Sequence, residues 1–369
     1  MRYVRLYFLL QLSPLLAHNY FYGRISMLKY FICLLFLFST LVYADDNVLN
    51  LYTWSGDIPD SVIRAFEKET HIKVNYSTYD SNETLYAKLL AIKNPGYDIV
   101  QPSSYYLTRM RDQGMLLPID KTKIPNLKYL TQTALHPSYD PERKYSVPCL
   151  WGVTGIFVNK AFYDPSTIHS WKDLWQKKYN NQVLLIDDVR EVFSISLITL
   201  GLSPNTSQPT EIMQAYQHLL LLRPNIKLFA TDAVASIVTD DDATIGMGWN
   251  GDIFKAHQGN SNIVFIYPQD GFVAWADDLA IPKGAKHLNN AYKFLNFIER
   301  PDINAKIIAE EGYPTGNLAA RAYLPKAMQS SNILFPSDAV MKHAIWQGDI
   351  SDKAISLYGH YWELLKLAA

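Results

Sequence analysis

Residues 48–79 have the sequence VLNLYTWSGDIPDSVIRAFEKETHIKVNYSTY, in which two apolar segments flank an amphipathic one. Residues 48–54 and 73–79 are rich in the β-branched and aromatic side chains that favour strands. Between them, residues 59–70 place Val62, Ile63 and Phe66 on one face of a predicted helix. This order predicts a βαβ unit, in which a helix connects two parallel strands.

The same alternation continues along the chain. We expect Asp80 to cap a helix that carries Leu85, Leu89 and Leu90, and residues 97–103, YDIVQPS, to form a strand. After about residue 153 the pattern recurs, with a capping-box helix start in SWKDLW at 170–175, strands in VLLIDD at 183–188 and TIGMGW at 244–249, and a helix in EVFSISLITL at 191–200. The sequence therefore predicts an α/β protein with two similar halves, each a mostly parallel sheet flanked by helices, with short crossing strands and a ligand between them.

The composition is that of a well-packed globular protein without a charge bias. The chain has 369 residues, is 49% hydrophobic and 19% charged, and has a formal net charge of -1. No overall field favours nucleic acid as a partner, so we expect none. Only Cys33 and Cys149 occur, which leaves the chain that follows Cys33 without an internal disulfide.

The N-terminal part predicts export. Residues 27–46, MLKYFICLLFLFSTLVYADD, contain one lysine, an apolar core and the small-residue end Val-Tyr-Ala, which is typical of a secretory signal peptide. We expect translation to start at Met27, cleavage to follow Ala44, and the product to be a soluble exported protein. The alternative for residues 1–26 is an uncleaved anchor, but their apolar part is far shorter than the roughly 20 residues that a spanning helix needs.

Aromatic and polar side chains stand where predicted strands end. Ligands of open α/β sheets bind beyond the carboxyl ends of the strands, where loops and helix starts meet. We therefore expect one pocket lined by Trp54, Ser103, Tyr105, Asp188 and Trp249.

Residues 274–282, AWADDLAIP, place Trp275 two positions before the acidic pair Asp277 and Asp278. An indole face holds a methylene chain and attracts an ammonium group by roughly 0.5 to 2 kcal/mol. A carboxylate adds about 1.5 to 3 kcal/mol for each hydrogen bond to a charged partner. The expected ligand is therefore a flexible organic polycation, with Trp275 against its carbon chain and Asp277 on an amine.

Asp188 and Glu191 allow two interpretations. Three residues apart at a helix start, they form a capping arrangement, and acids stabilise a helix N-terminus. The same spacing places both carboxylates on one face, where they could hold a cation. Both interpretations stay open on these residues alone.

Other motifs give weaker signals. The segment GMGWNG at 246–251 matches a dinucleotide fingerprint, but Trp249 and Asn250 stand where the backbone should approach a pyrophosphate, so we expect no nucleotide cofactor. Tyr105 and Tyr106 could be ligands of a ferric ion, yet no histidine or carboxylate partner has a matching spacing, and we expect no metal. We expect no enzyme, since no nucleophile motif occurs; a hydrolase that uses the acids at 188 and 191 is the alternative.

The chain after residue 44 resembles the periplasmic spermidine/putrescine-binding proteins of bacterial ABC transporters over nearly its whole length. The motifs that carry the resemblance follow one another in order and include YTWSGDIP, FEKETHIKVNYSTYDSNETLYAKL, YDIVQPSSYYL, SWKDLW, DDVREVF, GMGWNG, WADDLAIP, EGYPTGNLAA and WQGD. The resemblance implies a two-lobed type II periplasmic-binding-protein fold that closes on its ligand. It implies one lobe of residues 45–153 and about 277–321, and a second of about 154–276 and 322–369.

The resemblance also implies the roles of site residues. Aromatic residues would line the methylene chain, acids would hold the amines, and further polar groups would add hydrogen bonds. The expected ligand-binding residues are Trp54, Ser55, Asp57, Ser103, Tyr105, Asp188, Glu191, Trp249, Trp275, Asp277, Tyr313 and Gln347.

One segment departs from the family pattern. After the Trp-Ser or Trp-Thr pair, members of the family usually have an acid and then a tyrosine, whereas this chain has Gly56 and Asp57. We expect Asp57 to meet an extra ammonium group, so that spermidine binds more tightly than putrescine. We also expect Asp277 to face the ligand and Asp278 to be an exposed acid.

The resemblance implies a polyamine ligand and, as partners, the permease subunits of an ABC importer in the inner membrane. We expect a periplasmic monomer that needs no cofactor. Two further alternatives are an exported polyamine sensor without a transport role and a binder of another small cationic solute or of ferric ion.

Overall fold

The computed structural model describes residues 47–92, 96–231 and 233–368. The expected signal peptide, the start at Met27 and the cleavage after Ala44 lie outside the described residues. Within the described part of the chain, none of the helices combines the length and the apolar composition that crossing a bilayer requires.

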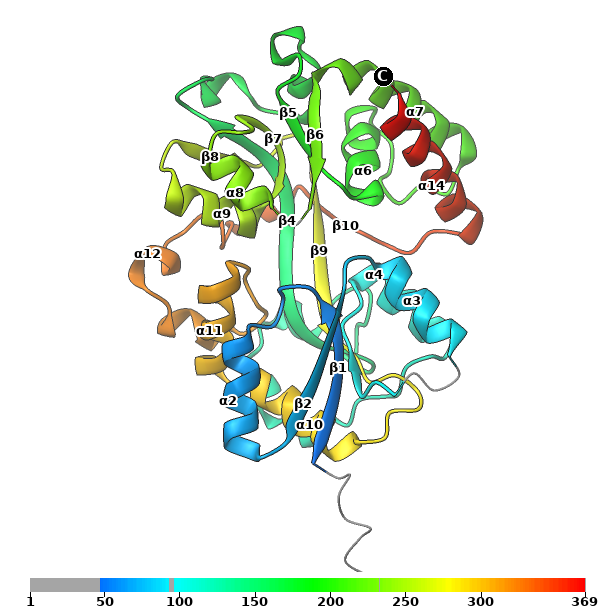
Figure 1. The fold of residues 1–369 in the computed structure, drawn as a ribbon, viewed down its shortest axis with the longest axis vertical. Helices are drawn as coiled ribbons and strands as arrows, with labels where there is room; N and C mark the ends of the chain where they lie inside the picture. The colour runs from blue at the N-terminus through cyan, green and yellow to red at the C-terminus, as the bar shows by residue number, and fades with distance from the viewer. Residues whose placement is uncertain (1–46, 93–95, 232, 369) are drawn as a thin grey trace, which may run out of the picture. The chain divides into compact units, whose positions relative to one another are not determined.

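Strands and helices alternate along most of the chain (Figure 1). The strands are β1 Val48–Trp54, β2 Lys73–Tyr79, β3 Ile99–Val100, β4 Val147–Asn159, β5 Val183–Ile186, β6 Ile226–Ala230, β7 Ile245–Trp249, β8 Ile263–Ile266, β9 Phe272–Leu279 and β10 Ala344–Trp346. The α-helices are α2 Asp60–Thr70, α3 Asn82–Ala91, α4 Ser104–Asp112, α5 Gln132–Leu135, α6 Val189–Thr199, α7 Pro209–Leu222, α8 Val234–Thr239, α9 Asn250–Gly259, α10 Leu288–Ile298, α11 Pro301–Glu311, α12 Lys326–Gln329, α13 Asp338–Met341 and α14 Asp352–Leu367.

The first βαβ unit forms as the sequence predicts. β1 and β2 have the predicted bounds, and α2 buries Val62, Ile63 and Phe66. β1 lies between β2 and β3 in a three-stranded sheet, and its pairing with β3 is parallel, with Leu51 opposite Ile99. Helices lie on both sides of this sheet, α2 and α11 on one and α3 and α4 on the other (Figure 1).

A seven-stranded sheet forms the second half and extends into the first. Its order is β10-β9-β4-β7-β5-β6, and β8 pairs with β4. β5 is parallel to β6 and to β7, and β10 is parallel to β9. The long strand β4 runs antiparallel to β7, β8 and β9. The predicted α/β fold class is confirmed. Parallel pairing is present in both sheets as expected, and β4 pairs antiparallel with its neighbours.

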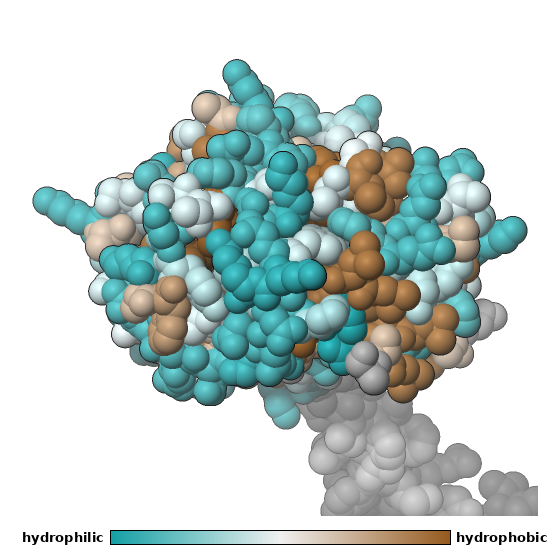
Figure 2. All heavy atoms as spheres, turned by 90° about the horizontal axis from the view of Figure 1, so that it is seen from above, coloured by the Kyte–Doolittle hydropathy of each residue, from teal (hydrophilic) through white to brown (hydrophobic). Residues whose placement is uncertain are grey.

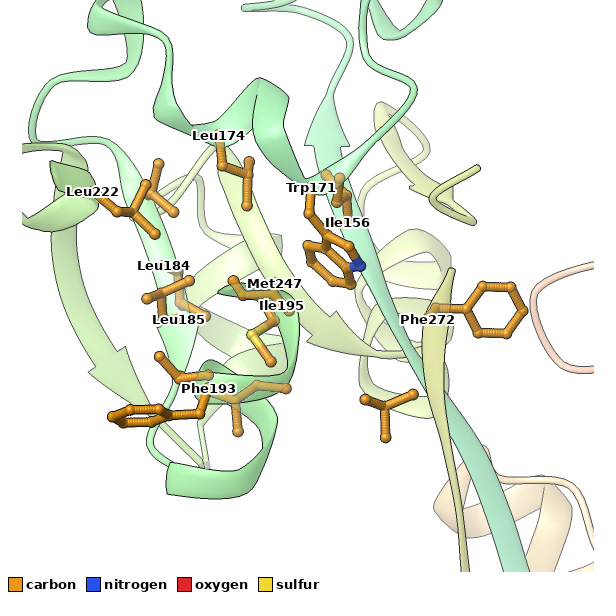
Figure 3. Packing of buried hydrophobic residues seen from close by; sticks show 14 of the residues in the cluster. Ile156, Trp171, Leu174, Leu184, Leu185, Phe193, Ile195, Leu222, Met247 and Phe272 are labelled. Carbon is orange, nitrogen blue, oxygen red and sulfur yellow. The ribbon is translucent and has the colours of Figure 1, made fainter. Parts of the chain in front are cut away.

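The two largest hydrophobic clusters of the described residues define two lobes. We call lobe 1 the part around one core, at residues 49–150 and 279–307, and lobe 2 the part around the other, at residues 153–274 and 350–365. In lobe 2, Trp171, Phe193 and Met247 converge between the sheet and its helices (Figure 3). The residues of this core are buried, and the face of the molecule that Figure 2 shows combines a large hydrophilic area with a smaller hydrophobic one.

β4 and β9 connect the lobes and run side by side through the middle of the molecule (Figure 1). Their pairing begins with Val147 opposite Leu279 in the lobe 1 core and reaches Val153 opposite Ala274 in the lobe 2 core. The change of core along both strands supports lobe boundaries near residues 153 and 277, which we retain as a proposal. A smaller cluster joins Phe254 of α9 to α11 and to residues 320–334.

The expectation that Asp278 is exposed is wrong. Its side chain is 0% exposed and forms an ion pair with the buried Arg143. Ser146 Oγ donates a second hydrogen bond to Asp278, at 2.9 Å. Successive side chains of a strand point to opposite faces, so β9 directs Asp277 and Asp278 to different sides. Two adjacent acids in the sequence therefore have unrelated environments.

Two local expectations also need correction. Ser81, rather than Asp80, caps α3, because its hydroxyl accepts the Thr84 N–H. SWKDLW does begin with the capping box of Ser170 and Asp173, but the helix that follows is a short 3₁₀ helix at Trp171–Trp175. Both segments match a helix start in composition, and the local chain geometry decides which residue forms the cap.

Replacing Asp278 with asparagine will destabilise the fold, because it removes the carboxylate that pairs directly with the buried Arg143 guanidinium. Removing one partner of a buried ion pair costs about 3 to 5 kcal/mol. The control Asp112→Asn breaks a pair whose acid is 62% exposed, and it should cost less than about 1 kcal/mol. Urea unfolding measures both free energies, and equal losses for the two variants would contradict the structural role of Asp278.

Candidate functional site

A cavity of about 320 Å³ lies between the two lobes. Every ligand-binding residue predicted from the sequence lines it, although what each residue binds stays a prediction. They are Trp54, Ser55, Asp57, Ser103, Tyr105, Asp188, Glu191, Trp249, Trp275, Asp277, Tyr313 and Gln347.

Strand ends and helix starts supply many of these side chains, as the sequence predicts. Trp54 is the last residue of β1, and Ser103 precedes the first turn of α4. Asp188 is the N-cap of α6, and Trp249 is both the last residue of β7 and the N-cap of α9. Trp275 differs, because it lies in the middle of β9. The crossing strand itself is therefore one wall of the cavity.

A row of aromatic rings follows the cavity wall. The ring centroids of Trp249 and Trp275 are 6.2 Å apart, and those of Trp275 and Tyr313 are 5.3 Å apart. Both contacts are edge-to-face, which suits aromatic quadrupoles. The row leads from Trp249 at the Glu191 side of the cavity to Tyr313.

Two glycines allow these rings to lie against the backbone. A Cβ atom on Gly152 would meet the Trp275 ring at 2.3 Å, and one on Gly251 would meet the Tyr313 ring at 2.4 Å. Both distances are far below van der Waals contact. Gly152 and Gly251 therefore fix the positions of two aromatic side chains in the cavity.

Asp188 and Glu191 combine a helix cap with a place in the cavity wall, and their holding of a cation stays a prediction. Asp188 Oδ1 accepts the Glu191 N–H at 2.9 Å and caps α6, while both side chains also line the cavity. Gln347 Nε2 donates to Glu191 Oε1 at 3.4 Å, and Glu191 Oε2 is buried without a hydrogen bond in the described part of the chain. Burial raises the pKa of Asp188 to about 6. Burial and then the Asp188 charge raise the pKa of Glu191 to about 8.

Asp277 is positioned by a hydrogen-bond network from lobe 1. Ser103 Oγ donates to Asp277 Oδ1 at 2.5 Å. Asn82 Nδ2 in turn lies 2.9 Å from Ser103 Oγ and 3.0 Å from the Tyr105 hydroxyl. Burial raises the pKa of Asp277 to about 7. The network therefore holds one oxygen of the Asp277 carboxylate in place.

The indole N–H groups of the cavity are also available. Those of Trp54, Trp249 and Trp275 are buried and reach no hydrogen-bond partner in good geometry among the described residues. The Trp249 N–H faces Glu191 and the Trp54 N–H faces Asp277, each short of that geometry. Buried polar groups that lack partners point to a ligand or to water in the cavity.

Asp57 turns into the cavity at its lobe 1 side. Gly56 precedes it with a φ of +85°, a backbone conformation that glycine adopts without strain. Gln101 Nε2 donates to Asp57 Oδ2 at 2.8 Å. Burial, followed by the charges of Asp277 and Glu311, raises the pKa of Asp57 well above its usual range.

The structure adds lining residues that the sequence reasoning did not select. They are Gly56, Tyr79, Asp80, Asn82, Thr231, Asp252, Lys255 and Glu311. Asp252 does have a signal in the sequence, since GMGWNGD at 246–252 pairs it with Trp249 as AWADDLAIP pairs an acid with Trp275. Asn82, Lys255 and Glu311 lie on α3, α9 and α11, whose apolar residues show little periodicity, so the sequence does not indicate the direction of a polar side chain. With them, seven carboxylates face a cavity whose only basic lining residue in the described chain is Lys255.

Comparisons with known proteins place this chain among related sequences. Residues 61–336 match the family model described as bacterial extracellular solute-binding protein. The spermidine/putrescine-binding periplasmic protein of Salmonella typhimurium is 43% identical over 323 residues, which are 88% of this chain and 92% of that protein. The putrescine-binding periplasmic protein SpuD of Pseudomonas aeruginosa is 34% identical over 342 residues, 88% of this chain and 93% of that protein.

A solved structure gives the same result for the fold. The spermidine/putrescine ABC transporter substrate-binding protein PotD of Streptococcus pneumoniae, crystallised with calcium and HEPES, superposes with a TM-score of 0.75. It is 31% identical, and the match covers 87% of this chain and 99% of that one. The two-lobed fold of type II periplasmic binding proteins is thereby confirmed.

The buried acids make the ligand-free protein less stable as the pH rises. The folded-state pKa values of Asp188, Glu191 and Asp277 are about 6, 8 and 7, all above those of an unfolded chain. The folded state therefore binds more protons than the unfolded state, and the free energy of unfolding falls as the pH rises from about 5 to 8. Each acid that is protonated in the folded state alone contributes a loss of about 1.4 kcal/mol per unit of pH.

Urea unfolding of the ligand-free protein at several pH values measures this slope. Glu191→Gln removes one of the titrating groups, so its stability should depend less on pH between about 6 and 8 than that of the wild type. Equal slopes for the two proteins would show that Glu191 does not hold a proton in the folded cavity.

Proposed function

The chain belongs to the family of bacterial extracellular solute-binding proteins, and from this premise we propose that it captures polyamines in the periplasm and delivers them to an ABC importer. The observation that carries the proposal is an interlobe cavity that combines an aromatic row with buried carboxylates. A linear polycation is complementary to both features at once. Its methylene groups match the rings, and its ammonium groups match the acids.

The ammonium groups of the ligand would supply the positive charge that the buried carboxylates of the cavity lack. Burial raises the pKa values of its acids, so part of their charge is held back at neutral pH. An ammonium group favours the ionised carboxylates and replaces their protons. We propose that Asp188 and Glu191 take one ammonium group and Asp277 another, with Gln347 and Ser103 holding the carboxylates of Glu191 and Asp277 in place.

The rings enclose the carbon chain. Trp249, Trp275 and Tyr313 form one wall, and Trp54 and Tyr105 belong to the lobe 1 side. Apolar contact and cation–π attraction of roughly 0.5 to 2 kcal/mol for each ring would contribute most of the affinity that remains after the amines are desolvated. Ser55 is proposed as an additional hydrogen-bonding group at the end of β1.

Binding alone is proposed as the activity. Asp188 caps α6 through the Glu191 N–H and both acids face the cavity, an arrangement that by itself does not favour the hydrolase alternative. A sensor that binds the same ligand would have the same cavity, so delivery to a permease is proposed from family membership. We further propose export by residues 27–44, action as a monomer, and no nucleic-acid partner.

Asp277→Asn will weaken polyamine binding, because it removes one carboxylate that would hold an ammonium group in a buried site. The loss should be roughly 30-fold or more, as for one partner of a buried hydrogen-bonded charge pair. Asp240→Asn is the control, since Asp240 is exposed at the end of α8. Calorimetric titration with spermidine and with putrescine measures the affinities.

Asp278→Asn is not a suitable control, because Asp278 stabilises the fold. Failure of the wild-type protein to bind either amine would contradict the proposed function. Wild-type affinity in Asp277→Asn would instead contradict the assignment of Asp277 while leaving polyamine binding intact.

A further inference from the structure

Lys255 is a cation inside a cavity that is otherwise acidic. It lies on α9 of lobe 2, and its Nζ is 3.3 Å from Oε2 of Glu311, the last residue of α11 in lobe 1. Both residues line the cavity together with Asp57 and Tyr313. The side chains are partly shielded, with exposures of 35% for Lys255 and 19% for Glu311.

The backbone holds Lys255 in this position. Phe254, the preceding residue, packs with Ala305 and Ile308 of α11, which fixes α9 against that helix. The Lys255 stem lies along Gly312, where a Cβ atom would meet its Cε at 3.2 Å. The ammonium group is therefore directed to the cavity by two packed helices rather than extended into solvent.

Lys255 acts on the acids around it. Burial is the main reason why the pKa of Asp57 is raised, the charges of Asp277 and Glu311 raise it further, and the Lys255 charge lowers it. Lys255 also opposes the effect of burial on the pKa of Glu311. In the ligand-free cavity this lysine is thus a counter-charge for Glu311 and, more weakly, for Asp57.

The lysine lies at one end of the aromatic row. Trp249 faces Glu191, Trp275 follows, and Tyr313 ends the row against Gly251 in the first turn of α9. Asp188 and Glu191 therefore belong to one end of the cavity, and Lys255, Glu311 and Asp57 to the other, where Asp252 also interacts with Tyr313. A ligand that extends along the row brings its last ammonium group toward Lys255.

We propose that Lys255 is a specificity-determining residue. Its ammonium group occupies the acidic end of the cavity at Tyr313. A diamine held by Asp188, Glu191 and Asp277 does not reach this end. A triamine does, and its third ammonium group must share Glu311 and Asp57 with a fixed like charge. Lys255 thus lowers the affinity for spermidine relative to putrescine. This inference rests on the proposed function.

Lys255→Met removes the charge and keeps the apolar stem. It should strengthen spermidine binding by roughly fivefold or more, since like charges brought close together are repulsive, and change putrescine binding by less than about twofold. Glu311→Gln should have the opposite effect on spermidine, because it leaves Lys255 without its partner. Calorimetric titration of both amines gives the ratio of the two affinities for each variant.

Lys366→Met is the matched control. Lys366 pairs with Asp187 at 3.3 Å and is 34% exposed, values close to those of Lys255 and Glu311, but it does not line the cavity. It should leave both affinities unchanged. The control distinguishes a general effect of removing a paired lysine from the specific effect of removing Lys255.

The ratio of affinities distinguishes the outcomes. If the Lys255–Glu311 pair only joined the lobes, Lys255→Met would shift both amines by the same factor, and the inference would be overturned. An unchanged ratio with intact binding would overturn it as well, while the proposed function would stand. Absence of binding by the wild type would overturn both.

Discussion

The burial of several carboxylates around one interlobe cavity is the constraint on which the rest of the structure depends. A buried charge without a counter-charge is costly, so the pKa values of Glu191 and Asp277 rise toward neutrality and part of the charge is withheld. The aromatic row offers ammonium groups an attractive surface but supplies no charge. Lys255 offsets the acids at one end only. The ligand-free cavity thus has more buried carboxylates than positive charges, and a polycation would balance them.

The crossing strand β9 connects this site to the fold. The side chains of β9 alternate between its two faces, which places Trp275 and Asp277 in the cavity. Asp278 points to the opposite face of the strand and pairs with Arg143 there. Gly152 of the neighbouring strand β4 provides the space in which the Trp275 ring lies. Because both strands also carry side chains into the two cores, the geometry of the site and the joining of the lobes are set by the same residues.

The sequence predicts the fold where local periodicity and tertiary packing agree. The β1–α2–β2 unit has its predicted bounds because its apolar residues face one core. Asp278 could not be placed from composition, since its direction depends on the register of β9 and on Arg143, which is distant in sequence. Lys255 and Glu311 were missed for a similar reason: only the packing of α9 on α11 brings them together. The aromatic and acidic residues in distinctive motifs were the ones that sequence reasoning could place in the pocket.

The most direct test of this account is the number of protons released when spermidine binds. Titration calorimetry at pH 7 in buffers of different ionisation enthalpy measures that number for the wild type and for Glu191→Gln. Because the pKa values of Glu191 and Asp277 lie at about 8 and 7 in the free cavity, binding should release roughly one proton, and Glu191→Gln should release fewer. Binding without proton release, or with the same release by both proteins, would contradict the claim that ammonium groups replace protons on buried acids.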